Sequence, residues 1–207
     1  MKWKVCGMRD PEKIAALTAL QPDNLGFIFW EQSKLFVTEP LPPIPETVKK
    51  VGVFVDANTS TLKTRVEQHQ LDAVQLHGQE APEQCEDLKA LGVTIIKAFA
   101  VGPTFDFSVL EAYEAHCDYF LLDTKGKAPG GNGLKFNWEL LRNYPSTTPF
   151  FLSGGIGPED AAALQELIKS ELPLHAIDLN SKFELQHGLK DITALQQFNT
   201  QLRCNTM

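Results

Sequence analysis

Short apolar runs recur along this chain at intervals of about 20 to 30 residues, and this spacing constrains the fold more than any other feature. The runs occupy residues 3–6, 24–29, 50–55, 73–76, 94–98, 119–122, 149–152 and 176–179. Residues 51–55 and 120–122 do not alternate with polar positions, which is typical of parallel strands covered by helices on both faces. The runs therefore predict eight parallel strands.

Helical patterns fill the intervals between these runs. They cover residues 11–17, 59–69, 82–91, 109–116, 138–143, 160–170 and 191–202. The start of the first helix is predicted by Asp10, which is a good N-cap, and by Pro11 at the first helical position. The interval between the second and third runs differs: residues 38–45 hold four prolines, and the helix after them is predicted to be short.

Strands that alternate with helices over 207 residues indicate an α/β protein, and eight such units predict a (β/α)₈ barrel, the TIM-barrel architecture. A doubly wound open sheet is the structural alternative. The chain is short for a barrel, so its loops must be short. No linker or low-complexity tract divides it, and residues 1–207 are expected to form a single domain.

The overall charge limits the class of partner. The net charge is −7 and the isoelectric point is near 5.2, which argues against nucleic acid but leaves room for a local positive pocket. No apolar stretch reaches the roughly 18 residues that span a bilayer, and the start of the chain lacks the apolar core of a signal peptide. Cys6, Cys85, Cys117 and Cys204 form no CxxC pair, so neither a metal site nor a disulfide framework is expected, and a cytoplasmic location fits best.

Polar residues that directly follow the apolar runs are the candidates for an active site, because barrel enzymes place theirs at the C-terminal ends of the strands. Cys6 ends the first run. It is either a small buried hydrophobe or a base whose pKa is lowered by positive groups. Gln75 and His77 end the fourth run on one face, where either could bind a polar ligand. A histidine satisfied within its own loop is the alternative.

Asp123 follows the apolar residues 120–122. A carboxylate at that point costs desolvation unless it is paired or functional, and a buried carboxyl is suited to donating a proton. The alternative role is a cap for the next turn. The loop over residues 124–133 is long, glycine-rich and basic, and it is predicted either to fold over a ligand or to lie in solvent.

The seventh run ends at Ser153 and leads into Gly154-Gly155, with Pro158 placed to open a helix. Glycines let the backbone approach a ligand, and N–H groups at a helix start bind anions, most often phosphate. A tight strand-to-helix connection is the alternative. The eighth run ends in residues 178–181, and barrels commonly bind phosphate between these two loops. The sequence therefore predicts a split phosphate site.

Seven short motifs occur in one order along nearly the whole chain. They are residues 4–7, 26–29, 75–78, 121–123, 130–133 with Phe136 and Trp138, 153–155, and Asp178 with Ser181 and Glu184. Together they resemble the phosphoribosylanthranilate isomerases of tryptophan biosynthesis. The resemblance implies a (β/α)₈ barrel that acts on a phosphorylated small molecule without a cofactor or metal. It also implies the reaction, an Amadori rearrangement of N-(5-phosphoribosyl)anthranilate to 1-(2-carboxyphenylamino)-1-deoxyribulose 5-phosphate.

The resemblance assigns roles to individual residues. Asp123 matches the family's general acid, which protonates the furanose ring oxygen, and Cys6 matches the general base, which removes the C2′ proton as the thiolate. The expected binding positions are Gly154, Gly155, Asn180 and Ser181 for the phosphate, His77 and Asp178 near the anthranilate, and Gly131 in the loop after Asp123. Members of the family are monomers or homodimers, and either state is expected here.

One position departs from the family pattern. The family usually carries an arginine after the second strand, in a Ser-x-Arg-Tyr segment, that pairs with the anthranilate carboxylate. Leu35 stands at that position here. Loss of a bidentate guanidinium should weaken carboxylate binding, and the neighbouring Lys34 is expected to reach the carboxylate instead. The alternatives are an isomerase for another phosphorylated aminosugar and a binder of phosphorylated ligands without turnover.

Overall fold

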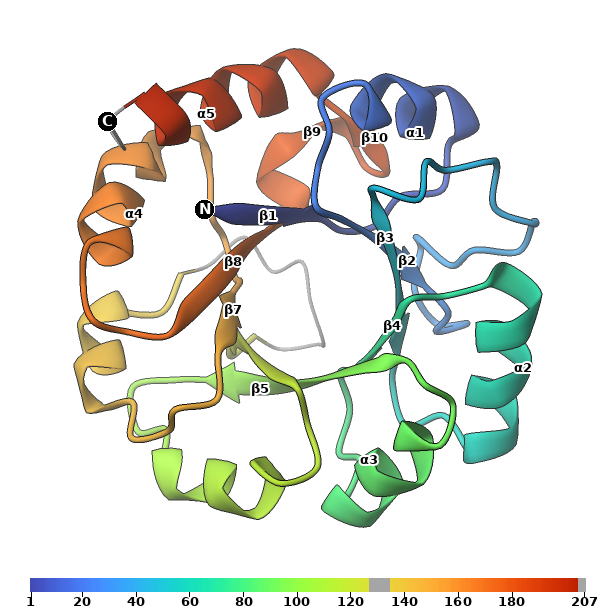
Figure 1. Ribbon diagram of the computed structural model, residues 1–207. Helices are drawn as coiled ribbons and strands as arrows, with labels where there is room; N and C mark the ends of the chain where they lie inside the picture. Colours follow the sequence, from blue (N-terminus) through green and yellow to red (C-terminus); the bar gives the residue numbers. More distant parts are fainter. Residues whose placement is uncertain (127–134, 205–207) are drawn as a thin grey trace.

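The computed structural model describes residues 1–126 and 135–204. Eight parallel strands close into a barrel in chain order, with β8 paired back to β1 (Figure 1). The strands are β1 (Lys2–Val5), β2 (Asn24–Ile28), β3 (Lys49–Phe54), β4 (Ala73–Leu76), β5 (Thr94–Val101), β6 (Tyr119–Thr124), β7 (Phe150–Leu152) and β8 (Leu174–Leu179). The closed order confirms the predicted (β/α)₈ barrel and excludes the doubly wound open sheet.

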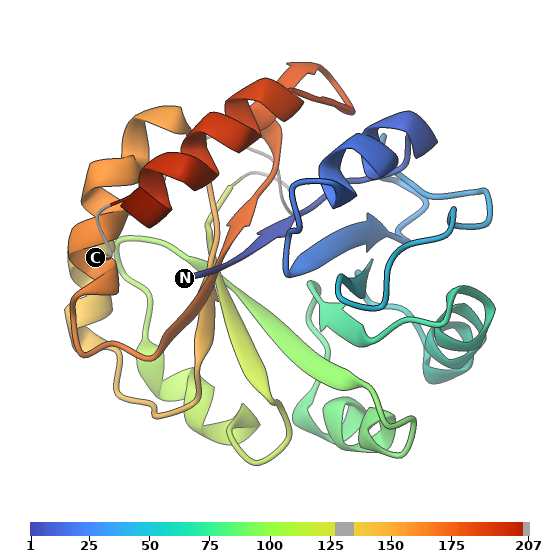
Figure 2. The same cartoon turned by 45° about the horizontal axis from the view of Figure 1, so that its top comes forward.

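Helices form an outer ring around the strands (Figures 1 and 2). The α-helices are α1 (Pro11–Thr18), α2 (Thr59–His69), α3 (Pro82–Lys89), α4 (Ala161–Ile168) and α5 (Ile192–Cys204). The 3₁₀ helices are η1 (Phe107–Tyr113), η2 (Trp138–Asn143), η3 (Pro158–Asp160) and η4 (Ser181–Phe183), and a hairpin of β9 (Glu184–Gln186) and β10 (Leu189–Lys190) precedes α5. None of the helices in these described residues is long and apolar enough to cross a membrane.

Local signals set the helix starts but did not set every helix type. The Asp10 carboxylate accepts a hydrogen bond from the backbone N–H of Lys13 at 2.9 Å, as an N-cap should. The segments predicted as helices over 109–116 and 138–143 are the 3₁₀ helices η1 and η2. The short helix expected after residues 38–45 is wrong, because only turn residues separate that segment from β3. Four prolines leave too few amide donors there for a helix to begin.

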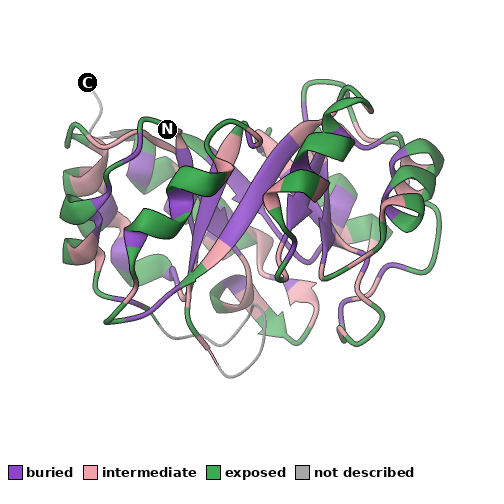
Figure 3. Cartoon of the chain, turned by 90° about the horizontal axis from the view of Figure 1, so that it is seen from below, coloured by how far each residue is buried: buried purple, intermediate pink, exposed green. Residues whose placement is uncertain are grey.

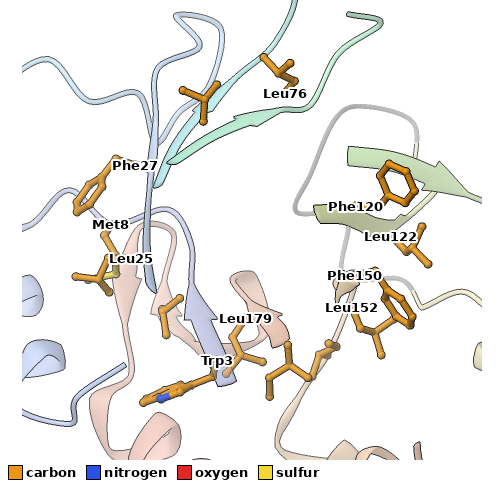
Figure 4. Packing of buried hydrophobic residues seen from close by; sticks show 14 of the residues in the cluster. Trp3, Met8, Leu25, Phe27, Leu76, Phe120, Leu122, Phe150, Leu152 and Leu179 are labelled. Atoms are coloured by element: carbon orange, nitrogen blue, oxygen red, sulfur yellow. The ribbon is translucent and has the colours of Figure 1, made fainter. Parts of the chain in front are cut away.

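Two apolar layers hold the barrel together. The outer layer lies between strands and helices and includes Trp3, Phe27 and Phe120, whose side chains point away from the barrel axis (Figure 4). The inner layer fills part of the barrel and comprises Val51, Ala73, Ile96, Ala98, Leu121, Phe151 and Ala176. The strands are buried along most of their length while the outer helix faces are exposed (Figure 3).

Strand register places polar residues inside the barrel beside this apolar layer. Lys4 pairs with Asp178 across the β1–β8 ladder, while their neighbours Trp3 and Ile177 belong to the outer layer. Because side chains alternate along a strand, Lys4 and Asp178 face the interior. The barrel interior is therefore part apolar and part ionic, and the ionic part leads to the cavity described below.

Candidate active site at the carboxyl ends of the strands

The strand ends surround a cavity that opens to solvent. It is lined by Cys6, Ile28, Trp30, Ser33, Val53, Val55, Gln75, His77, Asp123, Thr124, Ser153, Gly154, Gly155, Ile156, Asp178, Asn180, Ser181 and Lys182. The cavity thus brings together eight of the ten residues predicted from the sequence. Lys34 does not line it, and Gly131 lies outside the described residues together with most of the predicted loop over residues 124–133.

Cys6 directly follows β1 and is buried beside the cavity. A Cβ atom at residue 26 would lie 2.7 Å from Cys6 Sγ, so Gly26 of β2 makes the space for the thiol. Burial raises the pKa of the Cys6 thiol above its ordinary value, while the ammonium groups of Lys4 and Lys190 oppose that rise. Of the two alternatives left open by the sequence, a small buried hydrophobe and a base with a lowered pKa, the second expected the opposite direction. Desolvation, together with the Asp178 carboxylate, outweighs the two cations.

Lys4 is fully buried inside the barrel and hydrogen-bonds two side chains. Its Nζ donates to Gln75 Oε1 at 2.8 Å and to Asp178 Oδ1 at 3.0 Å, and its charge also acts on the nearby Cys6 thiol. Burial lowers the pKa of Lys4, but Asp178 and Cys6 outweigh burial and the pKa is raised, so the ammonium stays charged. Sequence reasoning assigned no role to Lys4. The available signal was a lysine two residues before Cys6, on the same face of the strand.

A chain of polar contacts leads from Lys4 toward Asp123. Gln75 Nε2 lies 2.7 Å from His77 Nδ1, which agrees with the prediction that these two side chains share a face. His77 Nε2 lies 3.4 Å from Asp123 Oδ2. The other carboxylate oxygen of Asp123 accepts the backbone N–H of Thr124 at 2.9 Å. Asp123 therefore presents Oδ2 to the cavity, and its remaining oxygen is held by the backbone of β6.

The Gly154-Gly155 turn supplies backbone to the opposite side of the cavity. Both glycines have positive φ, +93° and +64°, where residues with a Cβ are disfavoured. A Cβ on Gly154 would lie 2.5 Å from the backbone nitrogen of Thr124, so this turn packs directly against the end of β6. The helix then starts as η3, where Asp160 accepts the N–H of Gly157 at 2.7 Å. Within residues 1–126 and 135–204, no carboxylate accepts a hydrogen bond from the N–H groups of Gly154 or Gly155.

The loop after β8 completes this part of the cavity. Asn180 Oδ1 accepts a hydrogen bond from Lys190 Nζ at 2.7 Å, and Glu184 Oε1 accepts another from the same nitrogen at 2.6 Å. The hairpin of β9 and β10 thus fixes Asn180 in place beside Ser181. Lys182 also lines the cavity and is exposed, so it adds a positive charge that sequence reasoning missed. A cation directly after the predicted phosphate loop was the signal available for it.

The ends of β2 and β3 form an apolar side. Ile28, Val53, Val55 and Trp30 line it, and they suit the flat face of an aromatic ring. Sequence reasoning assigned none of these four to the site. Aliphatic residues at strand ends look the same whether they face a ligand or the core, so no local signal separates the two.

Leu35 and Lys34 lie behind this side of the cavity. Leu35 is buried, and Cβ atoms built on Gly7 and Gly188 would lie 2.8 and 3.0 Å from its methyl groups. It therefore fills the space between the β1 loop and the β9–β10 hairpin. The side chain of Lys34 is exposed, and its backbone carbonyl accepts a hydrogen bond from Arg9 at 3.1 Å.

Comparisons with known proteins agree on one family. The chain matches the family model of N-(5′-phosphoribosyl)anthranilate (PRA) isomerase over residues 3–201. It is 44% identical over 205 residues to N-(5′-phosphoribosyl)anthranilate isomerase of Parabacteroides distasonis, which covers 96% of this chain and 92% of the relative. The crystal structure of phosphoribosyl anthranilate isomerase from Thermotoga maritima superposes with a TM-score of 0.85 at 29% identity over 98% of both chains. A phosphoribosyl anthranilate isomerase in complex with reduced 1-(o-carboxyphenylamino)-1-deoxyribulose 5-phosphate gives a TM-score of 0.81 at 27% identity over 98% of both chains.

The fold is a closed (β/α)₈ barrel, and its strand ends place a thiol and a carboxyl around one cavity, which is the arrangement of barrel enzymes with their active site at this rim. In the described residues, no group of three or more His, Cys, Asp and Glu is arranged to hold a metal ion. The chain belongs to the N-(5′-phosphoribosyl)anthranilate isomerase family and is an isomerase of tryptophan biosynthesis. Its family membership confirms the resemblance found in the seven ordered motifs.

Proposed function

We propose that Cys6 and Asp123 are the base and the acid of an Amadori rearrangement of N-(5-phosphoribosyl)anthranilate. Asp123 protonates the furanose ring oxygen, the C1′–O bond breaks, and the nitrogen lone pair forms the C=N bond of a protonated Schiff base. The Cys6 thiolate then takes the proton from C2′, and the C–H electron pair forms a C1′=C2′ bond that neutralises the nitrogen. The resulting enolamine loses the O2′ proton and gains one at C1′ to become the ketone.

One observation carries this assignment: β1 and β6 direct the two residues into the same cavity, and each is held there by its own contacts. The raised pKa of Cys6 fits this sequence of steps. A buried thiol is neutral in the empty site, and the cationic Schiff base formed by the first step favours its ionisation. The thiolate is therefore most populated once the substrate ring has been opened.

The phosphate group is proposed to bind between the glycine turn and the loop after β8. Gly154 and Gly155 offer backbone N–H groups, while Ser181 and Asn180 offer side chains from the facing loop. Lys182 adds a positive charge to this end of the cavity, and an exposed lysine there attracts the anion without fixing its orientation. The phosphate would hold C1′, C2′ and the ring oxygen between Cys6 and Asp123.

The anthranilate ring is proposed to lie on the apolar side formed by Trp30, Ile28 and the two β3 valines. His77 and Asp178 then lie at the end of the ligand that carries the ring. Leu35 leaves the carboxylate without the arginine that the resemblance implies, so we propose that Lys34 or the hydroxyl of Ser33 contacts it. Family membership supports this substrate over another phosphorylated aminosugar and over a binder without turnover.

The Cys6→Ser and Asp123→Asn variants test the assignment. Each should lose about 10²- to 10⁴-fold in kcat, the usual contribution of one acid or base, while KM changes little. The rate is followed as the loss of substrate fluorescence. Asp87→Asn, which removes a carboxylate from the exposed face of α3, is the control and should keep the wild-type rate. Full activity in both site variants would refute the acid–base pair. Leu35→Arg, measured alongside, reports the carboxylate contact as a lower KM.

We further infer that the chain is one domain and works in the cytoplasm as a monomer or homodimer with a small-molecule substrate and without nucleic acid. The buried free thiols of Cys6, Cys85 and Cys117 support a reducing compartment. The net charge of −7 supports the absence of a nucleic-acid partner.

A further inference from the structure

The orientation of the Gln75 side-chain amide is fixed by Lys4. Gln75 is buried in β4, and its Oε1 lies 2.8 Å from Lys4 Nζ. An ammonium group has donors and no acceptor. A flipped amide would place an NH₂ group against this buried cation, so donor would face donor. Asp178 neutralises the charge from another side at 3.0 Å but cannot reverse that preference. The amide oxygen therefore faces Lys4 and the amide nitrogen faces away from it.

The amide nitrogen in turn determines which nitrogen of His77 carries the proton. Gln75 Nε2 lies 2.7 Å from His77 Nδ1. The amide nitrogen only donates, so Nδ1 must accept with a free lone pair. A ring protonated on Nδ1, or on both nitrogens, would again place donor against donor at this distance. The arrangement that satisfies all of these contacts is a neutral imidazole with its proton on Nε2.

We propose that Gln75 is a positioning residue, which passes the orientation set by Lys4 to His77 so that a neutral imidazole directs an N–H at Asp123. This inference rests on the proposed role of Asp123 as the general acid. His77 Nε2 lies 3.4 Å from Asp123 Oδ2, the carboxylate oxygen that the Thr124 backbone leaves free. At this distance the imidazole N–H faces that oxygen, without a full hydrogen bond between the two groups.

The neutral state of His77 matters because Asp123 must carry a proton to act as an acid. A doubly protonated imidazolium at this distance would favour the ionised carboxylate and hold back the proton. A neutral N–H donor faces the same carboxyl without adding a full positive charge. The charged groups around His77 are Asp123 on β6, Asp178 on β8 and Lys4 on β1, while Lys97 and Lys125 line a neighbouring pocket together with the ring.

The tautomer can be read directly by nitrogen NMR on the full chain labelled with [¹⁵N]histidine. The free wild-type protein at neutral pH should give a His77 Nδ1 signal typical of an unprotonated nitrogen and an Nε2 signal typical of a protonated one. The opposite tautomer, or a ring protonated on both nitrogens, would overturn the proposal. This measurement needs no turnover, so it stands apart from the kinetics of Cys6→Ser and Asp123→Asn, whose failure would refute the proposed function instead.

Gln75→Glu then tests the link between the two residues. A carboxylate accepts from both Lys4 and Nδ1–H, so the substitution should move the His77 signals toward the imidazolium form. With the ring charged, kcat should fall by at least about tenfold, because Asp123 is less often protonated. Gln68→Glu adds the same charge on the exposed face of α2 and should change neither readout. Unchanged His77 signals in folded Gln75→Glu would contradict the proposal even if activity fell, and Gln75→Met should release the tautomer without adding charge.

Discussion

Lys4 and Lys97 are both buried beside a carboxylate partner, yet their remaining hydrogen-bond donors face different kinds of group. Lys4 pairs with Asp178 at 3.0 Å and turns its other donors to side chains. Lys97 pairs with Glu80 at 3.1 Å and donates otherwise to backbone carbonyls, at residues 76, 78 and 98. Lys97 also lies 5.4 Å from the ring centroid of Phe99 in the outer layer. One pair faces the cavity, and the other faces the layer under the helices.

The surroundings of Glu80 complete the contrast. Its carboxylate accepts hydrogen bonds from the backbone N–H groups of Asp56 and Gly78, each at 2.9 Å. The Lys97–Glu80 pair therefore ties the loops after β3 and β4 to β5. A buried ion pair by itself is weak grounds for stability, because desolvation offsets the attraction between the charges. The role of each ion pair is indicated by the other contacts of its lysine. Lys97 donates to backbone carbonyls and so fixes loops, whereas Lys4 donates to the Gln75 amide and acts on the Cys6 thiol, and both of these groups line the cavity.

Lys4→Met and Lys97→Met should separate these two roles, and this is the largest effect we expect. Lys4→Met removes the cation that favours the Cys6 thiolate and frees the Gln75 amide, so kcat should fall by about 10²-fold or more. Lys97→Met should leave kcat of the folded protein near wild type while it lowers the free energy of unfolding by about 3–5 kcal/mol, since Glu80 stays buried without its partner. Steady-state kinetics and urea unfolding measure the two quantities.

Each variant serves as the control for the other. Lys4→Met also leaves a buried carboxylate, Asp178, so some loss of stability is expected in both proteins. The rate must therefore be compared at a temperature where both are folded, as judged by near-UV circular dichroism. Equal losses of kcat in the two folded variants would break the contrast between a pair that serves the cavity and a pair that ties loops.

Gly154→Ala tests the proposed phosphate-binding turn, and the expected effect is a rise of about tenfold in KM. The added Cβ would collide with the Thr124 backbone at a φ of +93°, so the turn must move and KM should rise by about tenfold, with kcat less affected. Gly92→Ala is the matched control. Gly92 also has a positive φ, +68°, but a Cβ there meets nothing within 4 Å. A similar rise of KM in Gly92→Ala would assign the effect to general backbone strain.

The smallest expected effect is on the pH dependence of kcat/KM, which tests whether Lys4 acts on the Cys6 thiol. Burial raises the pKa of Cys6, so the reactive thiolate becomes more common as pH rises and kcat/KM should increase on the alkaline side of neutrality. Lys4 opposes the effect of burial. Lys4→Met should therefore move this limb to higher pH, by about one unit, whereas Lys97→Met should leave it in place. A limb that stays where it is in Lys4→Met would mean that Lys4 does not act on the thiol.

Much of this molecule was predictable because its signals are local. The apolar runs gave all eight strands to within a few residues, and Asp10 and Pro11 marked the start of α1. Strand ends gave most of the cavity, since a parallel barrel brings them to one rim. The proline-rich segment was harder. A short helix was predicted after the four prolines, but the choice between a short helix and a turn depends on how the chain reaches β3.

The residues that sequence reasoning missed share a physical reason. The roles of Lys4 and Trp30 depend on spatial neighbours that are far away in the chain. Asp178 lies 174 positions from Lys4, and Trp30 lines a cavity together with residues of β3 and β6. Leu35 is the reverse case. Its substitution was visible in the sequence, but the structure alone places its side chain between Gly7 and Gly188.

The sequence by itself determined the strand count, the order of the motifs and the identity of a thiol and a carboxyl at strand ends, because these follow from periodicity and from residue type. Only the tertiary structure decided the electrostatics of the site. Closure of β8 onto β1 buries Lys4 against Asp178 and Gln75, and burial raises the pKa of Cys6, a direction that the sequence left open. A pKa depends on the solvent removed and the charges gathered in three dimensions, and neither quantity is written in the spacing of residues along a chain.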